Sequence, residues 1–559
     1  MSQKVRKQQS FEYGAIILLC STVMVKIIGA IFKIPLKNII GELGFGYFTS
    51  AYDLFTSIYT LAMAGLPIAI SRGVAEHMTA KRYKDVKSSL KITRRLFFIT
   101  GLTGFILMLL FIYPFVHFTD ATGKTVYSLF AIAPSLLFCC VMSTYRGYYE
   151  GLRNMYPTAV SDVIEALGKL ILGYAFSFVI MKYTGNPAYA SAGALLGITV
   201  GAGVSAGYLR LRYKIKGDGI TKEELSNAPE HINTKVATKT IIMIAIPVLL
   251  ASLSNSVASL VDVSMVKWQL TKLVGTHSHV LRDMYSSAIA SYNKSYDTLT
   301  NAEIPTFLYG IRGMAFTIYN LIPTITSVLG VSALPVLASS WALKDKKLIK
   351  RNVESTMKFT ALIAMPAGMG FLFIGPDIMK LLYNSVSAVT IGGPMMRIYG
   401  IAAIFAGMAI PMTSLLQAID KQSISLRNVA IGAGLKVVVN YIFVGIPTLN
   451  IQGAAIGTVA CYMFIFIANL ISIIKYTGIK PNIYKSLFKP LFAGLCCGVS
   501  TLFVTFGGGK INTIAKICVA AVVYLAALIL LNTFEADDVT SLPKGEKILK
   551  VLTKCKIIR

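Results

Sequence analysis

Long apolar runs alternate with short polar segments along nearly the whole chain. The runs fall near residues 14–36, 47–71, 92–115, 126–145, 160–181, 188–209, 240–266, 306–340, 358–382, 389–416, 426–447, 453–475, 486–506 and 512–533. About 20 consecutive apolar residues are enough for a helix to cross a bilayer, and most of these runs reach that length. The pattern therefore predicts an all-α polytopic membrane protein with about 14 transmembrane helices.

Lysine and arginine concentrate in every second polar segment. The basic segments lie at 4–7, 72–95, 210–222, 344–351 and 475–489. The segments between them are short and nearly free of cations, except for the longer one at 267–305. Cytoplasmic loops of membrane proteins carry an excess of lysine and arginine. The alternation therefore predicts a multi-pass protein of the cytoplasmic membrane with both termini in the cytoplasm.

The two halves of the chain resemble each other. GLPIAIS at 65–71 is similar to ALPVLAS at 333–339, and EALGKLILGYAF at 165–176 is similar to GAGLKVVVNYIF at 432–443. We expect two six-helix lobes in a pseudo-two-fold repeat, plus two C-terminal helices, with substrate bound between the lobes. The predicted parts are an N-terminal lobe at 1–215, a cytoplasmic inter-lobe loop at 216–239, a C-terminal lobe at 240–476, the two added helices at 477–535 and a cytoplasmic tail at 536–559.

The composition agrees with a membrane protein and argues against several other classes. Hydrophobic residues make up 55% of the chain and charged residues 14%, with a mean hydropathy of +0.65. The net charge of +29 comes from cations in the loops, so no nucleic-acid partner is expected. The cysteines and histidines lack metal-ligand spacing, and GGGK at 507–510 lacks the serine or threonine of a nucleotide-binding P-loop. We expect no metal, no nucleotide and no other cofactor.

Three of the cations inside apolar runs are the first candidates for a binding site. Lys26 is at the middle of the first run, where a charge costs about 2.5–3.5 kcal/mol on insertion scales unless it faces a polar cavity. We therefore predict that Lys26 lines a cavity. Lys33, two turns later on the same helical face, either lines the same cavity or extends to the interface. Arg312, near the start of the eighth run, either anchors that helix at the interface or faces the cavity.

Several further charges are candidates for the same region. Asp53 and Asp262 lie in apolar runs, where each could neutralise a cavity cation or carry a coupling proton, with structural pairing as the favoured role. Glu165 and Lys169 are spaced to pair on one helical face. Lys436, the repeat equivalent of Lys169, has glycine where Lys169 has that acid.

Three stretches of the chain resemble a known family. They are VKIIGAIFKIPLKNIIGELGFGYF at 25–48, GLPIAISRGVAEH at 65–77 and YYEGLRNMYPTAVSDVIEALGKLILGY at 148–174. They are similar to the stage V sporulation protein B family, polysaccharide exporters of the multidrug/oligosaccharidyl-lipid/polysaccharide (MOP) superfamily that are related to MurJ-type lipid II flippases. The resemblance implies a MATE/MurJ-like fold and a part in peptidoglycan or spore cortex synthesis. It also implies that the two added helices form a groove for a lipid tail.

Two shorter stretches resemble the MurJ type. KIIG at 26–29 is similar to its RxLG signature, and IRGMAF at 311–316 is similar to its DRLMEF stretch. In that family these arginines line a cationic central cavity, so the resemblance implies that Lys26 and Arg312 hold a lipid-linked pyrophosphate. Lysine in place of the first arginine keeps the charge but loses the bidentate geometry. A second cationic position of the family aligns near Asp53, where this sequence reverses the charge.

The resulting hypothesis is a flippase, and not an enzyme, for a polyprenyl-pyrophosphate-linked cell-wall saccharide. Lys26 and Arg312 would bind the pyrophosphate, with contributions from Lys33, Lys169 and Lys436. The expected partners are this lipid-linked saccharide and membrane lipids, while a monomeric state and association with cell-wall synthases stay open. The alternatives are a multidrug/cation antiporter, a membrane-bound transferase acting on lipid-linked sugars, and a non-transporting scaffold.

Overall fold

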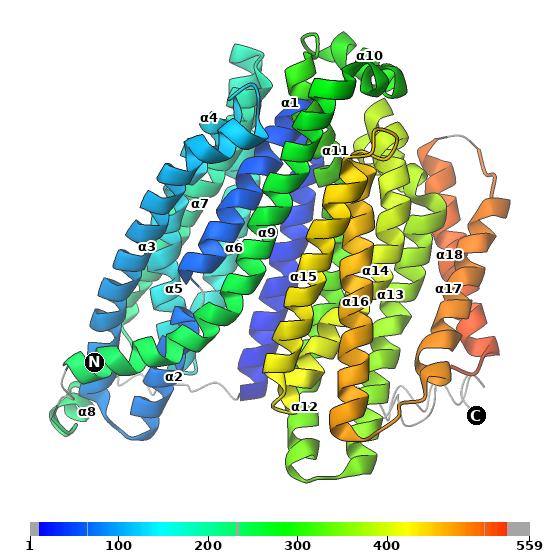
Figure 1. Cartoon of the computed structure of the whole chain (residues 1–559). Coiled ribbons are helices and arrows are strands. Elements are labelled where there is room, and N and C mark those ends of the chain that lie inside the picture. Colours follow the sequence, from blue (N-terminus) through cyan, green and yellow to red (C-terminus); the bar gives the residue numbers. More distant parts are fainter. Residues whose placement is uncertain (1–10, 64, 231–233, 508, 534–559) are drawn as a thin grey trace. The chain divides into compact units, whose positions relative to one another are not determined.

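The computed structural model describes residues 11–63, 65–230, 234–507 and 509–533, and these ranges contain helices and no strand (Figure 1). The predicted all-α class is confirmed. The same ranges contain 12 helical spans that are long and apolar enough to cross a membrane. This supports a multi-pass membrane protein, although the predicted number of about 14 helices is not confirmed.

The contacts divide the chain into two compact units. The first unit comprises Met1–Val274 and Leu299–Gly310, and the second comprises Gly275–Thr298 and Ile311–Arg559. The helices that lie in the first unit, or begin in it, are α1 (Phe11–Met63), α2 (Leu66–Thr79), α3 (Tyr83–Thr119), α4 (Thr125–Ile132), α5 (Ser135–Gly151), α6 (Tyr156–Thr184), α7 (Pro187–Lys216), α8 (Lys222–Ser226), α9 (Thr234–Met284) and α11 (Ile304–Tyr319). The other helices, all in the second unit, are α10 (Ser286–Ser295), α12 (Leu321–Ala342), α13 (Lys346–Tyr383), α14 (Gly393–Ala418), α15 (Gln422–Val444), α16 (Gln452–Thr477), α17 (Lys489–Ser500) and α18 (Lys510–Leu530).

Helix α9 belongs to the first unit up to Val274. Ile241 and Ala245 of α9 join an apolar cluster with Met63, Phe97 and Cys140. The predicted lobes divide the chain at 216–239 instead, and that division remains a prediction. The predicted loop at 267–305 is largely helical in the structure, because α9 continues to Met284 and α10 follows it. Its polar sequence lacks an apolar run, so hydropathy alone did not reveal these helical turns.

Helix α1 contains two helical halves that fold back on each other at Gly41. The ring centroids of Phe32 and Phe48 are 5.9 Å apart, whereas residues so spaced in a straight helix would be about 24 Å apart. Gly41 has φ 67° and ψ −179°, a conformation that glycine adopts without the penalty of a Cβ atom. The predicted run at 14–36 is therefore separate from the run at 47–71, which covers the second half of α1 and the start of α2. A single span, Cys20–Thr79, includes both runs.

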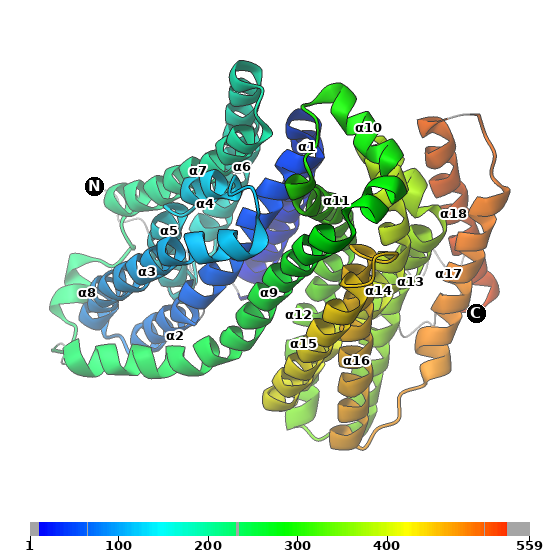
Figure 2. The same ribbon diagram turned by 45° about the horizontal axis from the view of Figure 1, so that its top comes forward.

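Glycine also allows the backbones of α6 and α7 to approach closely. A Cβ atom on Gly168 of α6 would lie 2.6 Å from the Cα atom of Gly201 on α7. Small residues at such crossings are typical of helices packed in lipid. Helices α3, α5 and α7 form a further packed set in the same unit (Figure 2). These contacts fix the helices that line the two cavities described below.

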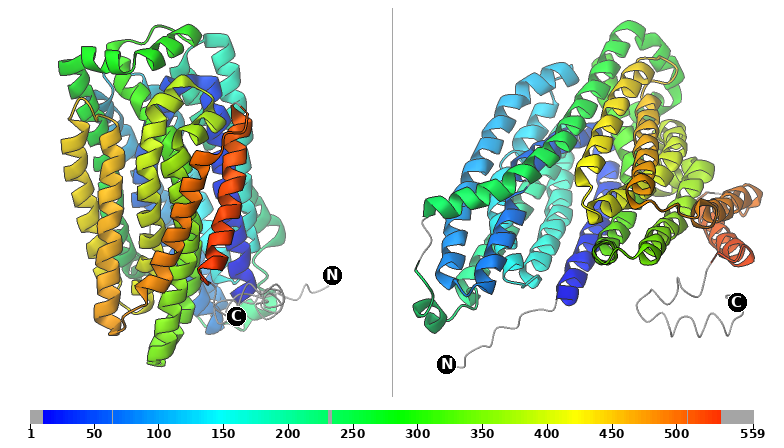
Figure 3. Two further views of the ribbon diagram at one scale, coloured as in Figure 1. Left: turned by 90° about the vertical axis from the view of Figure 1, so that its right-hand side faces the viewer. Right: turned by 60° about the horizontal axis from the view of Figure 1, so that its bottom comes forward.

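The two C-terminal helices pack on α13 in the second unit. Figure 3 shows α17 and α18, in orange and red, side by side. Lys516 of α18 forms an ion pair of 2.6 Å with Asp377 of α13, and the Tyr524 hydroxyl donates to the Leu362 carbonyl at 2.9 Å. The predicted helices at 486–506 and 512–533 thus correspond to α17 with its flanking turns and to α18.

Candidate substrate-binding site

A cavity of about 310 Å³ lies inside the first unit, between the two halves of α1 and helices α5, α6 and α7. Its lining includes three of the charged residues selected from the sequence, Lys26, Glu165 and Lys169. The two halves of α1 contribute because the chain turns back at Gly41, and α6 is held against α7 by the glycine contact. The cavity therefore depends on packing between segments that are far apart in the sequence.

Arg146 of α5 organises the acidic part of this cavity. Its guanidinium forms ion pairs with Asp162 at 3.0 Å and with Glu165 at 2.9 Å, and its Nε donates to the Ser161 hydroxyl at 2.8 Å. The expected pairing of Glu165 with Lys169 is therefore wrong. A planar guanidinium can serve two carboxylates at once, and α5 brings it within reach of both.

Sequence reasoning missed Arg146 as a site residue. It lies one residue beyond the apolar run at 126–145, where a basic residue is expected to mark the end of a membrane helix. A usable signal was present, because Asp162 and Glu165 are three residues apart and lie on one face of the next helix. Two acids on one face of a membrane helix require a nearby cation, and Arg146 is the basic residue of the preceding helix.

Lys33 and Lys169 share one aromatic ring. The Lys169 Nζ atom lies 4.5 Å from the centroid of Tyr52 and donates to its hydroxyl at 3.4 Å. The Lys33 Nζ atom lies 5.3 Å from the same ring, and Lys169 also lies 5.4 Å from the ring of Phe32. Cation–π contacts of this kind hold lysines without neutralising them.

The three lysines of this region, Lys26, Lys33 and Lys169, have no ion pair with any residue that the structure describes. Lys26 is exposed, whereas Lys33 and Lys169 are half-buried. The two carboxylates that line the cavity are already bound by Arg146. The lining carries three cations, Lys26, Arg146 and Lys169, against these two carboxylates, so it keeps a net charge of +1, which suits an anionic ligand.

Asp53 lies on the second half of α1 and is hydrogen-bonded. The fully buried Tyr309 hydroxyl donates to its Oδ2 atom at 2.8 Å. The Nζ atom of Lys267, which is also fully buried, lies 5.8 Å from the Tyr309 ring. All three residues belong to the first unit.

The remaining candidates do not line this cavity. Arg312 lies two turns inside α11, is 3% exposed and has its guanidinium 5.3 Å from the ring centroid of Phe316. Asp262 of α9 is buried, and Lys436 of α15 is half-buried. Arg312 and Lys436 belong to the second unit. The predicted cooperation of Lys26 with Arg312 across two lobes remains a prediction.

The chain matches characterised proteins along most of its length. The family profile described as "Polysaccharide biosynthesis protein" matches residues 13–341, and the profile MatE matches residues 306–442. Stage V sporulation protein B of Bacillus subtilis (strain 168) is 25% identical over 548 residues, which cover 96% of this chain and 98% of that protein. Lipid II flippase MurJ of the same organism is 22% identical over 537 residues, 91% of this chain and 92% of that protein.

Solved structures show the same fold. The structure of lipid II flippase MurJ in an inward closed conformation superposes with a TM-score of 0.65 at 13% identity, covering 92% of this chain and 98% of that chain. An inward-facing multidrug resistance MATE family transporter of the MOP superfamily gives a TM-score of 0.56 at 17% identity, over 82% and 99% of the two chains. Because the family match at residues 13–341 spans more than half of the sequence, the protein belongs to the polysaccharide biosynthesis protein family.

Proposed function

We propose that the protein is a flippase that carries a lipid-linked anionic saccharide across the cytoplasmic membrane without changing it chemically. The observation that supports this proposal is the cationic cavity of the first unit. Lys26 and Lys169 line it, and Lys33 lies against the same tyrosine as Lys169. An ammonium group binds phosphate oxygens through short, charge-assisted hydrogen bonds, so these lysines suit a pyrophosphate headgroup.

The relatives narrow the class of substrate. One relative is named a flippase of lipid II, and another is named a stage V sporulation protein. The proposed substrate is therefore a polyprenyl-pyrophosphate-linked saccharide for peptidoglycan or spore cortex. Arg312 and Lys436 would bind it from the C-terminal half of the chain during alternating access, and the lipid tail would lie along α17 and α18.

The favoured alternative among the fold's relatives is a multidrug/cation antiporter. A cationic substrate requires available carboxylates, but Asp162 and Glu165 are both engaged by Arg146. The excess of lysine in the same cavity would repel a cation. A transferase acting on lipid-linked sugars is a second alternative, and it differs from a flippase in changing its substrate chemically.

Transport of a fluorescent polyprenyl-pyrophosphate saccharide in proteoliposomes tests the proposal. The double variant Lys26→Gln/Lys169→Gln should lower the initial rate at least about tenfold, since two charge-assisted contacts are lost. Lys222→Gln/Lys350→Gln removes the same charge from exposed positions outside the cavity and should leave the rate unchanged.

Equal rates for the wild type and the cavity variant would refute the site. Export of an organic cation, with no movement of the lipid-linked saccharide, would establish the antiporter. Recovery of a chemically altered lipid would establish the transferase.

A further inference from the structure

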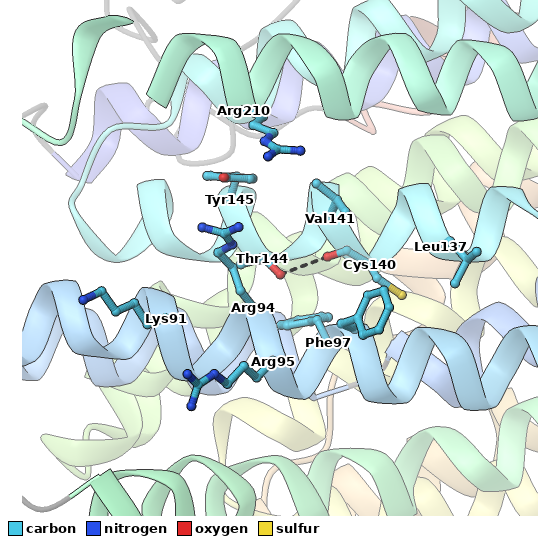
Figure 4. A pocket seen from close by; sticks show the side chains of 11 residues that line it. Lys91, Arg94, Arg95, Phe97, Leu137, Cys140, Val141, Thr144, Tyr145 and Arg210 are labelled. Carbon is cyan, nitrogen blue, oxygen red and sulfur yellow. Dashed lines mark hydrogen bonds between the residues drawn. The ribbon is translucent and has the colours of Figure 1, made fainter. Parts of the chain in front are cut away.

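A second cavity, of about 420 Å³, lies in the first unit between α3, α5 and α7 (Figure 4). It shares no lining residue with the cavity around Lys26. One part of its wall is cationic and is formed by Lys91, Arg94, Arg95 and Arg210. The rest is mostly apolar and includes Phe97, Phe98, Leu137 and Val141. The cavity is therefore amphipathic.

The four cations of this wall have no counter-charge among the residues that the structure describes. None forms an ion pair or hydrogen bond with a residue in the described part of the chain, and no carboxylate is among the lining residues. Lys91 and Arg95 are four residues apart on α3, a spacing at which like charges destabilise a helix. Elsewhere in the unit, Arg82 pairs with Asp85. All four side chains are exposed, so the cluster presents unpaired positive charge to an anion at this surface.

Two of the guanidinium groups converge. In Figure 4, Arg94 of α3 and Arg210 of α7 both point toward Tyr145 of α5, whereas Arg95 points to the other side of α3. Tyr145 is 3% exposed, and its ring lies 5.6 Å from that of Tyr213 on α7. A guanidinium binds phosphate oxygens through two parallel hydrogen bonds. The arrangement offers several donors to one phosphate group.

The apolar part of the wall continues into a lipid-facing surface. Phe98 is 61% exposed and the next residue, Ile99, is 59% exposed. These residues begin the apolar part of α3, directly after the cations of the basic segment at 72–95. Arginine and lysine at that position lie at the level of lipid headgroups. A ligand held there would have its phosphate at the interface and an acyl chain beside the apolar residues.

We propose that this cavity binds one anionic phospholipid from the cytoplasmic leaflet. Its phosphodiester lies between Arg94 and Arg210, and one acyl chain follows Phe97, Leu137 and Val141. The basic segments that adjoin the cavity are expected on the cytoplasmic side of the membrane. The inner surface of the membrane carries anionic lipid, so the ligand is assigned to that leaflet. The proposal concerns a site apart from the transported substrate, so it does not depend on which saccharide is moved.

Lipid binding to the purified full-length protein tests this site. The protein is placed in phosphatidylcholine nanodiscs, phosphatidylglycerol is titrated in, and bound lipid is counted by native mass spectrometry. Arg94→Gln/Arg210→Gln should weaken binding at least about tenfold through the loss of two charge-assisted contacts. Lys87→Gln/Lys214→Gln removes one cation from each of the same two helices outside the cavity, and should bind like the wild type.

A second variant tests the apolar part without touching the cations. Val141→Trp fills the acyl-chain wall and should also weaken phosphatidylglycerol binding, while circular dichroism reports an intact fold. Soluble glycerol phosphate should not compete, because it lacks the acyl chain. Equal binding by the wild type and the Arg94/Arg210 variant, or equal loss in the control pair, would overturn the proposal. Full competition by glycerol phosphate would overturn it in favour of a free-anion site.

Discussion

The Tyr52 ring holds two lysines that are not neutralised by an acid. Tyr52→Phe keeps the ring and should change the initial transport rate by less than about twofold, because only the long hydrogen bond from Lys169 is lost. Tyr52→Leu removes both cation–π contacts, each worth about 0.5–1 kcal/mol or more, and should lower the rate about fivefold or more. Initial rates in the proteoliposome assay compare the two variants. Similar rates for both would show that the ring does not position the lysines.

Arg146 holds two carboxylates in a partly buried site. Arg146→Gln leaves both without a partner and should destabilise the protein by about 2–3 kcal/mol, less than a fully buried pair would lose. The triple variant Arg146→Gln/Asp162→Asn/Glu165→Gln removes the acids as well and should recover most of the lost stability. Denaturant unfolding in detergent measures both variants. A triple variant no more stable than the single one would show that repulsion between the acids is not the cause.

Sequence reasoning selected much of this site but not its internal pairing. Lys26 was identified because a charge in an apolar run is costly, and Lys169 because of its spacing from Glu165 and its repeat equivalent Lys436. The structure brings Lys26 and Lys169 to one cavity. The partner of Glu165 depends on how α5 packs against α6, a long-range contact that spacing within one helix does not contain. That is why the pairing with Lys169 was expected and the ion pair with Arg146 was not.

At the scale of elements, the close contact between α6 and α7 positions Lys169. Gly201→Val should separate these helices and destabilise the protein by about 1–3 kcal/mol, as overpacking usually does. Gly207→Val is a matched control on the same helix, because a Cβ atom there would meet nothing within 4 Å. Thermal unfolding in detergent distinguishes the two. Equal unfolding temperatures would contradict the importance of the contact.

The turn from α3 to α4 is held by the Asp120 carboxylate. Its oxygens accept from the Thr125 amide at 2.8 Å and the Thr122 hydroxyl at 2.7 Å. Burial raises the pKa of Asp120, but the nearby Lys267 charge and these hydrogen bonds outweigh it and hold the pKa below 3.8. A depressed pKa adds stability that is complete above the unfolded value and is lost as the pH falls through the folded value.

Asp120→Asn should therefore be less stable than the wild type at neutral pH, and the difference should shrink only below about pH 4. Unfolding temperatures measured between pH 3 and 7 provide the comparison. A difference that stayed constant across that range would show that the Asp120 charge does not contribute.

Most of the predicted apolar runs coincide with membrane-length helices in the described ranges, because lipid imposes long apolar runs. Hydropathy also left a gap between 36 and 47, where the structure has the turn at Gly41. It did not reveal that α9 continues to Met284 or that α10 follows, since these turns are polar. Nor could it show that α9 packs with the first unit, because that depends on contacts such as those of Ile241 and Ala245.

At the scale of the whole molecule, the distribution of charge predicts the orientation of the protein in the membrane. Basic segments at 72–95, 210–222 and 344–351 alternate with segments poor in cations, which assigns the former to the cytoplasm. The same assignment underlies the leaflet proposed for the phospholipid site. Two exposed positions can distinguish the two sides of the membrane. Lys347 lies in the basic segment at 344–351, and Asp297 lies in the longer segment at 267–305, which the alternation places on the opposite side.

In a background without other cysteines, Asp297→Cys should react with a membrane-impermeant maleimide added to intact cells. Lys347→Cys should react only after the membrane is permeabilised. The reason is that short loops rich in lysine and arginine stay on the cytoplasmic side of the membrane. Labelling of Lys347→Cys from outside would show that the protein has the opposite orientation in the membrane. It would also move the phospholipid site to the outer leaflet, where the attraction to anionic inner-leaflet lipid no longer applies.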